Sequence, residues 1–258
     1  MDFRWRSDDR SHQTDAPSRR TVPMTTIALV HGAFHGAWCW DLLHPELEAS
    51  GFAVVAPDLP CDDPSAGCAA YADTVVTALA DVDDEVIIVG HSLAGLTIPL
   101  VAALRRVRRM VFLCAFLPQP GRPFMAQFGE EEGMFPHSPQ ETWPVSNPDG
   151  SMSWPPERAI PSLYADCPPE IAQWAAGRLR IQTLTPHAER CPLTTWPTVP
   201  SSYLLARQDG AVGAEWARRT AQERLGVTAD EIDGHHSPFL SRPKELATLV
   251  ADIVRRTA

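Results

Sequence analysis

Short, continuous hydrophobic runs alternate along this chain with longer segments whose hydrophobic residues recur at helical spacing. The clearest run, VIIV at 86–89, is apolar at every position, which predicts a strand covered on both faces of a parallel sheet. We predict strands at 26–30, 52–56, 85–90, 110–114, 202–206 and 227–232, and helices at 38–50, 69–79, 93–104, 214–225 and 243–256. This alternation predicts an α/β protein with a mostly parallel, doubly wound sheet.

The alternation is interrupted after Leu117 by a segment rich in proline. Sixteen of the 25 prolines lie between Pro118 and Pro200, and within this stretch only 168–181 has the pattern of a helix. A long insertion in a compact domain is typical of a lid or a binding element. We therefore expect a polar N-terminal tail (1–23), an α/β core in two parts (24–117 and 198–258) and a cap insertion (118–197).

Composition narrows the class of protein. Hydrophobic residues make up 44% and charged residues 21% of the 258 positions, as in soluble globular proteins. The net charge of -10 disfavours nucleic acid as a partner, and no apolar run reaches the roughly 20 residues of a membrane helix.

The six cysteines are scattered without zinc-ligand spacing, which favours free thiols and a cytoplasmic location. We expect no cofactor and no metal, and both a monomer and a homodimer are compatible with the sequence.

The motif with the most chemical content is GHSLAG at 90–95. It fits the pattern G-x-S-x-G and lies between a predicted strand and a predicted helix, where a serine nucleophile sits on a sharp turn. Gly90 and Gly95 leave room for the neighbouring backbone, and the start of the helix offers unpaired N–H groups to a developing negative charge. We therefore predict that Ser92 is a nucleophile; the alternative is a glycine-rich turn with a capping serine.

A serine nucleophile needs a base and an acid that orients the base, and in this fold the acid and then the histidine follow the serine. The loop after the strand ending at Cys114 contains no carboxylate, whereas the loop after 202–206 contains Asp209. We choose Asp209 as the acid; it could alternatively be a turn residue. His235 and His236 follow the last predicted strand, so either of them is a candidate base.

The loop after the first predicted strand reads HGAFHG at 31–36. In this kind of fold that loop supplies the second backbone N–H of an oxyanion hole. We assign Ala33 N–H and Leu93 N–H as the two donors. Metal binding by His31 and His35 is a weaker alternative, because no carboxylate or third histidine lies nearby in the sequence.

These motifs together resemble the α/β-hydrolase group that contains plant methyl esterases, such as the methyl-salicylate esterases, the hydroxynitrile lyases and many bacterial relatives. The resemblance runs from about residue 26 to 256, and the cap matches only in size and position. Its matching segments are HGAFHGAW at 31–38, DLP at 58–60, GHSLAG at 90–95, QD at 208–209 and GHHSPFLSRP at 234–243. The resemblance implies an α/β-hydrolase fold, and the register of its last segment selects His236 over His235 as the catalytic base.

The same group divides between ester hydrolysis and cyanohydrin cleavage. The resemblance implies that a lyase would carry a threonine near the oxyanion loop and a lysine just after the catalytic histidine. Here the loop has Gly32, Ser237 follows His236, and the one lysine, Lys244, begins the last predicted helix. Hydrolysis is therefore favoured over lyase chemistry.

We accordingly predict a serine esterase that cleaves a carboxylic ester, or a related acyl bond, of a small and largely apolar substrate through a Ser92–His236–Asp209 triad. The alternatives are a hydroxynitrile lyase, a non-hydrolytic small-molecule binding protein, and an enzyme of cyclisation or thioester release. The pocket is expected between core and cap. Its expected lining residues are Phe34, Leu93, Phe116, Phe124, Phe128 and Phe239.

Overall fold

A six-stranded parallel sheet forms the centre of the structure, a computed structural model that describes residues 25–83, 85–136 and 140–256. The tail predicted at 1–23 lies outside the described residues. In spatial order the strands are β2 (Ala53–Val55), β1 (Thr26–Val30), β3 (Val86–His91), β4 (Arg109–Leu113), β7 (Ser201–Ala206) and β8 (Asp230–Ile232). Every neighbouring pair is parallel, as the continuous apolar runs predict.

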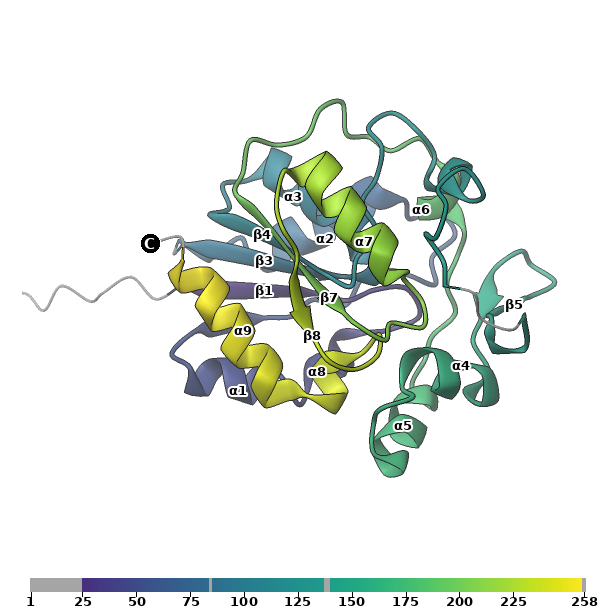
Figure 1. Cartoon of the computed structure of the whole chain (residues 1–258). Coiled ribbons are helices and arrows are strands. Elements are labelled where there is room, and N and C mark those ends of the chain that lie inside the picture. The colour runs from purple at the N-terminus through teal and green to yellow at the C-terminus, as the bar shows by residue number, and fades with distance from the viewer. Residues whose placement is uncertain (1–24, 84, 137–139, 257–258) are drawn as a thin grey trace, which may run out of the picture.

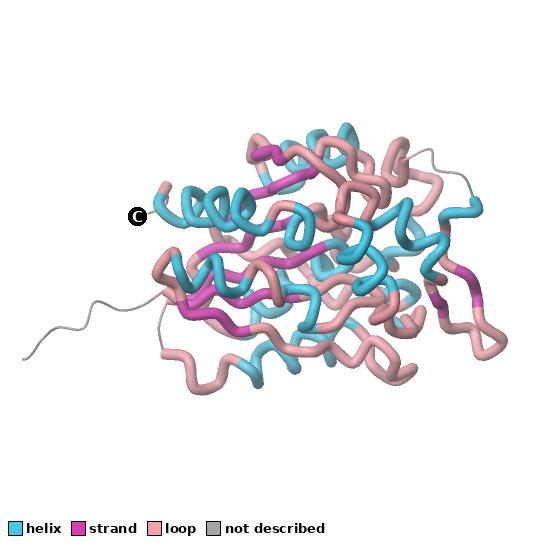
Figure 2. Tube along the Cα trace, turned by 90° about the horizontal axis from the view of Figure 1, so that it is seen from below, coloured by secondary structure: helices cyan, strands magenta, loops and turns pink. Residues whose placement is uncertain are grey.

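Helices cover both faces of the sheet (Figures 1 and 2). The helices α2 (Cys68–Ala78), α3 (Ile98–Leu104) and α7 (Ala214–Thr220) lie on one face, and α1 (His44–Ala49), α8 (Pro238–Ser241) and α9 (Pro243–Arg255) lie on the other. Alternate strand residues enter opposite cores: Ala28 packs with the α2 side, whereas Ile27 packs with the α9 side. This two-sided burial confirms the doubly wound α/β architecture.

The helices are shorter than their hydrophobic patterns suggest. The segment predicted as a helix at 38–50 forms a 3-10 turn, η1 (Ala37–Trp40), followed by α1. The segment at 93–104 likewise divides into η2 (Ser92–Leu96) and α3, because Pro99 can occupy only the first turn of a helix. The segment at 214–225 becomes α7 and a π-helical turn, η5 (Ala221–Leu225), that ends at Gly226.

The segment between β4 and β7 contains little regular structure, and we call residues 118–197 the insertion. Its helix α5 (Pro169–Ala176) is shorter than the predicted 168–181 and ends at Gly177. The insertion also forms the 3-10 turns η3 (Phe124–Gln127) and η4 (Gln140–Thr142), the helices α4 (Pro156–Leu163) and α6 (Thr185–Ala188), and a hairpin of β5 (Val145–Ser146) and β6 (Met152–Ser153). We did not predict α4, since Pro161 lies inside it.

The insertion lies beyond the carboxyl ends of the strands (Figure 1). These ends are where open α/β sheets bind ligands. Among the described residues, no helix combines the length and apolarity needed to cross a membrane. All six cysteines are buried and free.

Candidate active site

Ser92 occupies a strained turn between β3 and η2. Its backbone φ is 54°, a left-handed conformation that residues other than glycine seldom adopt. The turn is closely packed, since a Cβ atom on Gly95 would lie 1.9 Å from the backbone oxygen of Phe116. The Ser92 side chain is 8% exposed and borders a cavity. Strain of this kind persists where the surrounding structure enforces it, and it is concentrated at functional sites.

Asp209 and His236 meet across two loops at the end of the sheet. Asp209 follows β7 and His236 follows β8, and both side chains are 2% exposed. The Nδ1 atom of His236 lies 2.9 Å from each carboxylate oxygen of Asp209. The backbone N–H groups of Ala211 and Val212 also donate to Asp209 Oδ1, at 2.8 and 2.9 Å. This arrangement holds the carboxylate in place and directs the other ring nitrogen of His236 away from it.

Ser92 and His236 border the same cavity, from which Asp209 is set back. Within residues 25–83, 85–136 and 140–256, no hydrogen bond connects the Ser92 hydroxyl to the imidazole of His236. Hydrogen bonds of this type are often long before substrate binds and tighten in the reacting complex. In the described chain the neighbouring residue His235 makes no hydrogen bond to Asp209, whereas His236 does.

The loop after β1, residues 31–36, lies directly against Ser92, and we call it the β1 loop. A Cβ atom on Gly32 would lie 2.7 Å from the Cβ of Ser92, so only glycine permits this approach. Ala33 and Leu93 both border the cavity beside Ser92. Among the described residues, the backbone N–H of Ala33 donates to no other protein atom, so it is free to receive a ligand oxygen.

Three buried histidines surround this loop as neutral structural groups. His31 Nε2 accepts the Leu59 N–H at 2.9 Å, and burial lowers the pKa of His31 to about 4. His35 contacts the Ala33 carbonyl at 2.8 Å, and burial lowers its pKa to about 3. Burial also holds the pKa of His91 well below its usual value. A neutral imidazole has one donor and one acceptor. At His31 and His35 both ring nitrogens are engaged in hydrogen bonds of this kind, which leaves these two residues no role as metal ligands.

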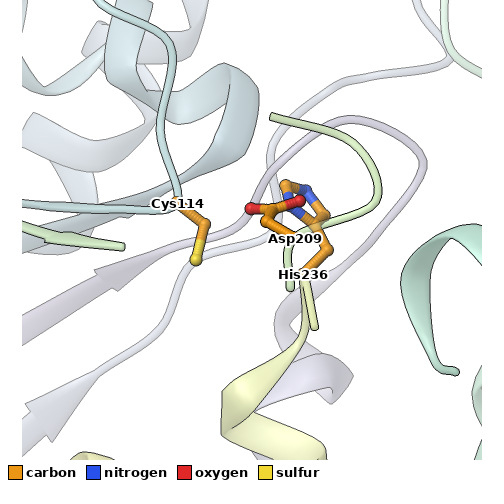
Figure 3. Close-up of side chains that lie close together, drawn as sticks. All are labelled: Cys114, Asp209 and His236. Carbon is orange, nitrogen blue, oxygen red and sulfur yellow. The ribbon is translucent and has the colours of Figure 1, made fainter. Parts of the chain in front are cut away.

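A buried thiol completes the surroundings of Asp209. Ligand atoms of Cys114, Asp209 and His236 all lie within 4.8 Å of one another (Figure 3). Burial, with a further contribution from the Asp209 charge, raises the pKa of the Cys114 thiol well above its ordinary value. The sulfur therefore remains protonated beside the carboxylate. The hydrogen bonds of Ala211, Val212 and His236 to Asp209 account for the position of the carboxylate in this cluster.

The cavity in front of Ser92 has a volume of about 410 Å³, which suits a small organic ligand. The expected pocket residues Phe34, Leu93, Phe116, Phe124 and Phe128 line it, together with residues we did not anticipate: Met125, Phe135, Trp143, Met152, Trp154, Leu163, Leu184 and His187. Burial lowers the pKa of His187 to about 4. The walls are therefore mostly apolar, with uncharged hydrogen-bonding groups.

The expectation for Phe239 is wrong. Phe239 is completely buried, and its ring packs 4.7 Å from that of Trp40 and 4.8 Å from that of His91. It lies in the first turn of α8, behind His236 on the core side of the histidine. Its apolar side chain therefore supports the back of the His236 loop instead of lining the cavity.

The architecture and this site define a class. A parallel sheet with a serine on a strained strand-to-helix turn, and an aspartate–histidine pair on the loops after its last strands, is the arrangement of the α/β hydrolases. The chain belongs to the alpha/beta hydrolase family, whose sequence profile matches residues 27–249.

Several known proteins resemble the chain over almost its whole length. Methylesterase 7 of Arabidopsis thaliana is 27% identical over 90% of this chain and 97% of its own length. Pyrethroid hydrolase of Sphingobium wenxiniae is 29% identical over 90% of this chain and 88% of its own. The crystal structure of polyneuridine aldehyde esterase has a TM-score of 0.75 at 23% identity and covers 90% of this chain and 99% of that one, which shows the shared fold.

Proposed function

We propose that the protein is a serine esterase that hydrolyses a carboxylic ester of a small, largely apolar molecule. The observation that carries this proposal is the geometry around one cavity. Ser92 is raised on a strained turn, and His236, paired with Asp209 at 2.9 Å, borders the same space. The relatives named as methylesterases and as a pyrethroid hydrolase, which are carboxylic ester hydrolases, support ester hydrolysis as the reaction.

In the proposed reaction His236 Nε2 takes the hydroxyl proton of Ser92 as the oxygen attacks the ester carbonyl carbon. The carbonyl π electrons move onto oxygen, and the N–H groups of Ala33 and Leu93 stabilise this oxyanion. The intermediate collapses, the alcohol leaves with the proton from His236, and an acyl group remains on Ser92. Water then attacks the acyl carbonyl, with His236 again accepting and returning the proton, and the acid is released. Asp209 holds the imidazole and stabilises its charged form.

The shape and polarity of the cavity support the proposed substrate class. Aromatic and aliphatic side chains make up most of its wall, so apolar acyl or alcohol groups would gain by leaving water. Met125, Phe128 and Trp143 line the cavity and are 40%, 38% and 46% exposed, which indicates that its mouth lies beside them. A substrate would enter between these residues and reach Ser92 on the floor.

A hydroxynitrile lyase on the same residues receives less support. Such a reaction releases cyanide, which needs a nearby cationic group. Lys244 lies in the exposed first turn of α9, and no lysine or arginine is among the described residues that line the cavity. Incubation with mandelonitrile should therefore release no cyanide above the rate of a Ser92→Ala control.

The direct test compares the parent protein with Ser92→Ala and His236→Ala on a series of p-nitrophenyl esters. Each variant should lose activity by about 10⁴- to 10⁶-fold. A fluorophosphonate probe should label the parent on Ser92 and should not label Ser92→Ala. Undiminished hydrolysis by Ser92→Ala would overturn the assignment, and absence of both labelling and hydrolysis in the parent would favour the small-molecule binding protein.

A further inference from the structure

The β1 loop contains a second strained residue. Phe34 has a backbone φ of 65°, and its side chain is 6% exposed. A bulky aromatic residue rarely adopts this left-handed conformation, so other contacts must maintain it. Phe34 directly follows Ala33, whose N–H is the proposed oxyanion donor. Any relaxation of Phe34 would therefore rotate the peptide groups that border the site.

Both backbone polar groups of Phe34 are bound by the insertion. The Arg180 N–H donates to the Phe34 carbonyl at 2.6 Å, and the Phe34 N–H donates to Gln182 Oε1 at 3.4 Å. Gln182 is completely buried, and its Nε2 is held in turn by the Tyr71 hydroxyl at 3.1 Å and the Thr183 carbonyl at 2.9 Å. Gln182 therefore has a single defined position against the loop.

A third contact reaches Ala33 through His35. The Tyr164 hydroxyl, at the end of α4, lies 2.8 Å from His35 Nε2, and His35 Nδ1 lies 2.8 Å from the Ala33 carbonyl. Since burial lowers the pKa of His35 to about 3, the ring is neutral under ordinary conditions. Its one ring proton is on Nδ1 and donates to Ala33, so Nε2 accepts from Tyr164. Tyr164 and His35 are 0% and 1% exposed.

The insertion is itself hydrogen-bonded to the core beside the β1 loop. The Arg180 guanidinium donates to the Leu59 carbonyl at 3.0 Å and to Asp62 at 2.7 Å. The Thr183 N–H donates to the Cys61 carbonyl at 2.9 Å. The segment 180–183 is therefore hydrogen-bonded to the core on one side and to the β1 loop on the other.

We propose that Tyr164 and Gln182, with the backbone of Arg180, are positioning residues that hold the β1 loop in the conformation required for transition-state stabilisation. This role rests on the proposed function, in which Ala33 N–H binds the oxyanion. The insertion would then have two roles. It covers the cavity, and it positions the Ala33 N–H, which is one of the two donors of the oxyanion hole. Since these contacts act on the loop and not on the substrate's ground state, their loss should lower kcat more than it raises KM.

Two pairs of variants separate positioning from simple stabilisation. Tyr164→Phe removes the donor to His35, and its control, Tyr203→Phe, removes a buried hydroxyl that donates to the Ala115 carbonyl at 2.5 Å. Gln182→Met removes the acceptor for Phe34, and its control, Gln127→Met, removes another fully buried amide, whose oxygen accepts from Arg224 at 3.2 Å away from the β1 loop. We expect Tyr164→Phe and Gln182→Met to lower kcat by about 10- to 100-fold, with KM within about twofold of the parent. Both controls should lower the melting temperature while keeping kcat within about twofold.

The affinity for a trifluoromethyl ketone gives a second readout that does not depend on turnover. Addition of Ser92 Oγ to its carbonyl passes the serine proton to His236 and places a negative oxygen in the oxyanion hole. Tyr164→Phe should weaken this inhibitor by the same factor as kcat/KM and leave the affinity for the matching neutral alcohol unchanged. Equal losses for ketone and alcohol, or parental kcat in both variants, would overturn the positioning role alone. Full activity in Ser92→Ala would instead overturn the proposed function.

Discussion

Cys114 and Asp209 approach each other at the ends of β4 and β7, with sulfur and carboxylate oxygen within 4.8 Å beside the ring of His236. Asp209 Oδ1 accepts hydrogen bonds from two backbone N–H groups in addition to His236. Oδ2 accepts from His236, and the protonated Cys114 thiol lies close to the same carboxylate. The carboxylate is therefore held by the backbone and by His236, with the neutral Cys114 thiol as a further polar neighbour.

This arrangement predicts the effect of changing Cys114. Cys114→Ala removes a polar S–H group beside a buried charge, which should lower the free energy of unfolding by about 1–3 kcal/mol and kcat/KM by about 3- to 10-fold. Cys114→Ser keeps a donor and should preserve kcat/KM to within about twofold. Chemical denaturation and ester hydrolysis measure the two effects. Cys39→Ala is the control, because Cys39 is also completely buried but lies away from Asp209; it should lose stability and keep its rate. Equal rates in Cys114→Ala and Cys114→Ser would refute a role for the donor.

The tight packing of the Ser92 turn predicts that Gly95 is required for folding. A Cβ atom at Gly95 would meet the backbone oxygen of Phe116 at 1.9 Å, and the loop backbone at Phe116 cannot easily move away, because it is buried and its N–H donates to the Ser92 carbonyl. Gly95→Ala should therefore cost more than about 3 kcal/mol of unfolding free energy or abolish soluble expression. Gly177→Ala is the matched control. Its Cβ would have 3.4 Å to the nearest atom, so the melting temperature should be unchanged or slightly higher. A soluble Gly95→Ala protein with parental stability would contradict the packing described here.

The parts of the molecule that could be predicted from sequence are those with local signals. The strands around Ser92 are continuous apolar runs. Asp209 follows such a run and His236 follows the last predicted strand, so their meeting follows from the topology of a parallel sheet. The contacts of Tyr164 and Gln182 with the β1 loop have no such signal. They lie in a proline-rich segment without periodicity, and they depend on backbone dihedral angles and hydrogen bonds between residues more than 100 positions apart.

The position of Phe239 also could not be predicted from the sequence, although it depends on residues close by in the chain. Its position three residues after His236 suggested a place in the pocket, but α8 begins at Pro238 and turns the ring toward Trp40. The short helical turn of α8 therefore places the Phe239 ring in the core and not in the cavity. The strain at Phe34 was equally invisible, because an aromatic residue carries no preference for a left-handed conformation.

The buried histidines predict how stability depends on pH. Folding lowers the pKa of His31 and His187 from 6.5 to about 4 and that of His35 to about 3, because burial disfavours the charged ring. Burial also lowers the pKa of His91 well below its usual value. Below pH 6.5 the unfolded chain therefore binds protons that the folded protein does not. Stability from this source is complete above about pH 6.5 and is lost as the pH falls toward 4.

The free energy of unfolding should consequently fall by at least about 2 kcal/mol per pH unit between pH 6 and pH 5. Among the carboxylates, Glu231 has a pKa lowered strongly, to about 2. Its effect on stability falls at pH values below 5, so the slope between pH 6 and pH 5 reports the histidines. Urea denaturation at fixed temperature across this range measures it. His31→Asn removes the titrating ring and keeps a polar side chain at this position, and it should reduce the slope by about 1.4 kcal/mol per pH unit. A flat profile between pH 7 and pH 5 in the parent would show that these rings take up protons without unfolding, and the neutral hydrogen-bond pattern assigned to the β1 loop would be wrong.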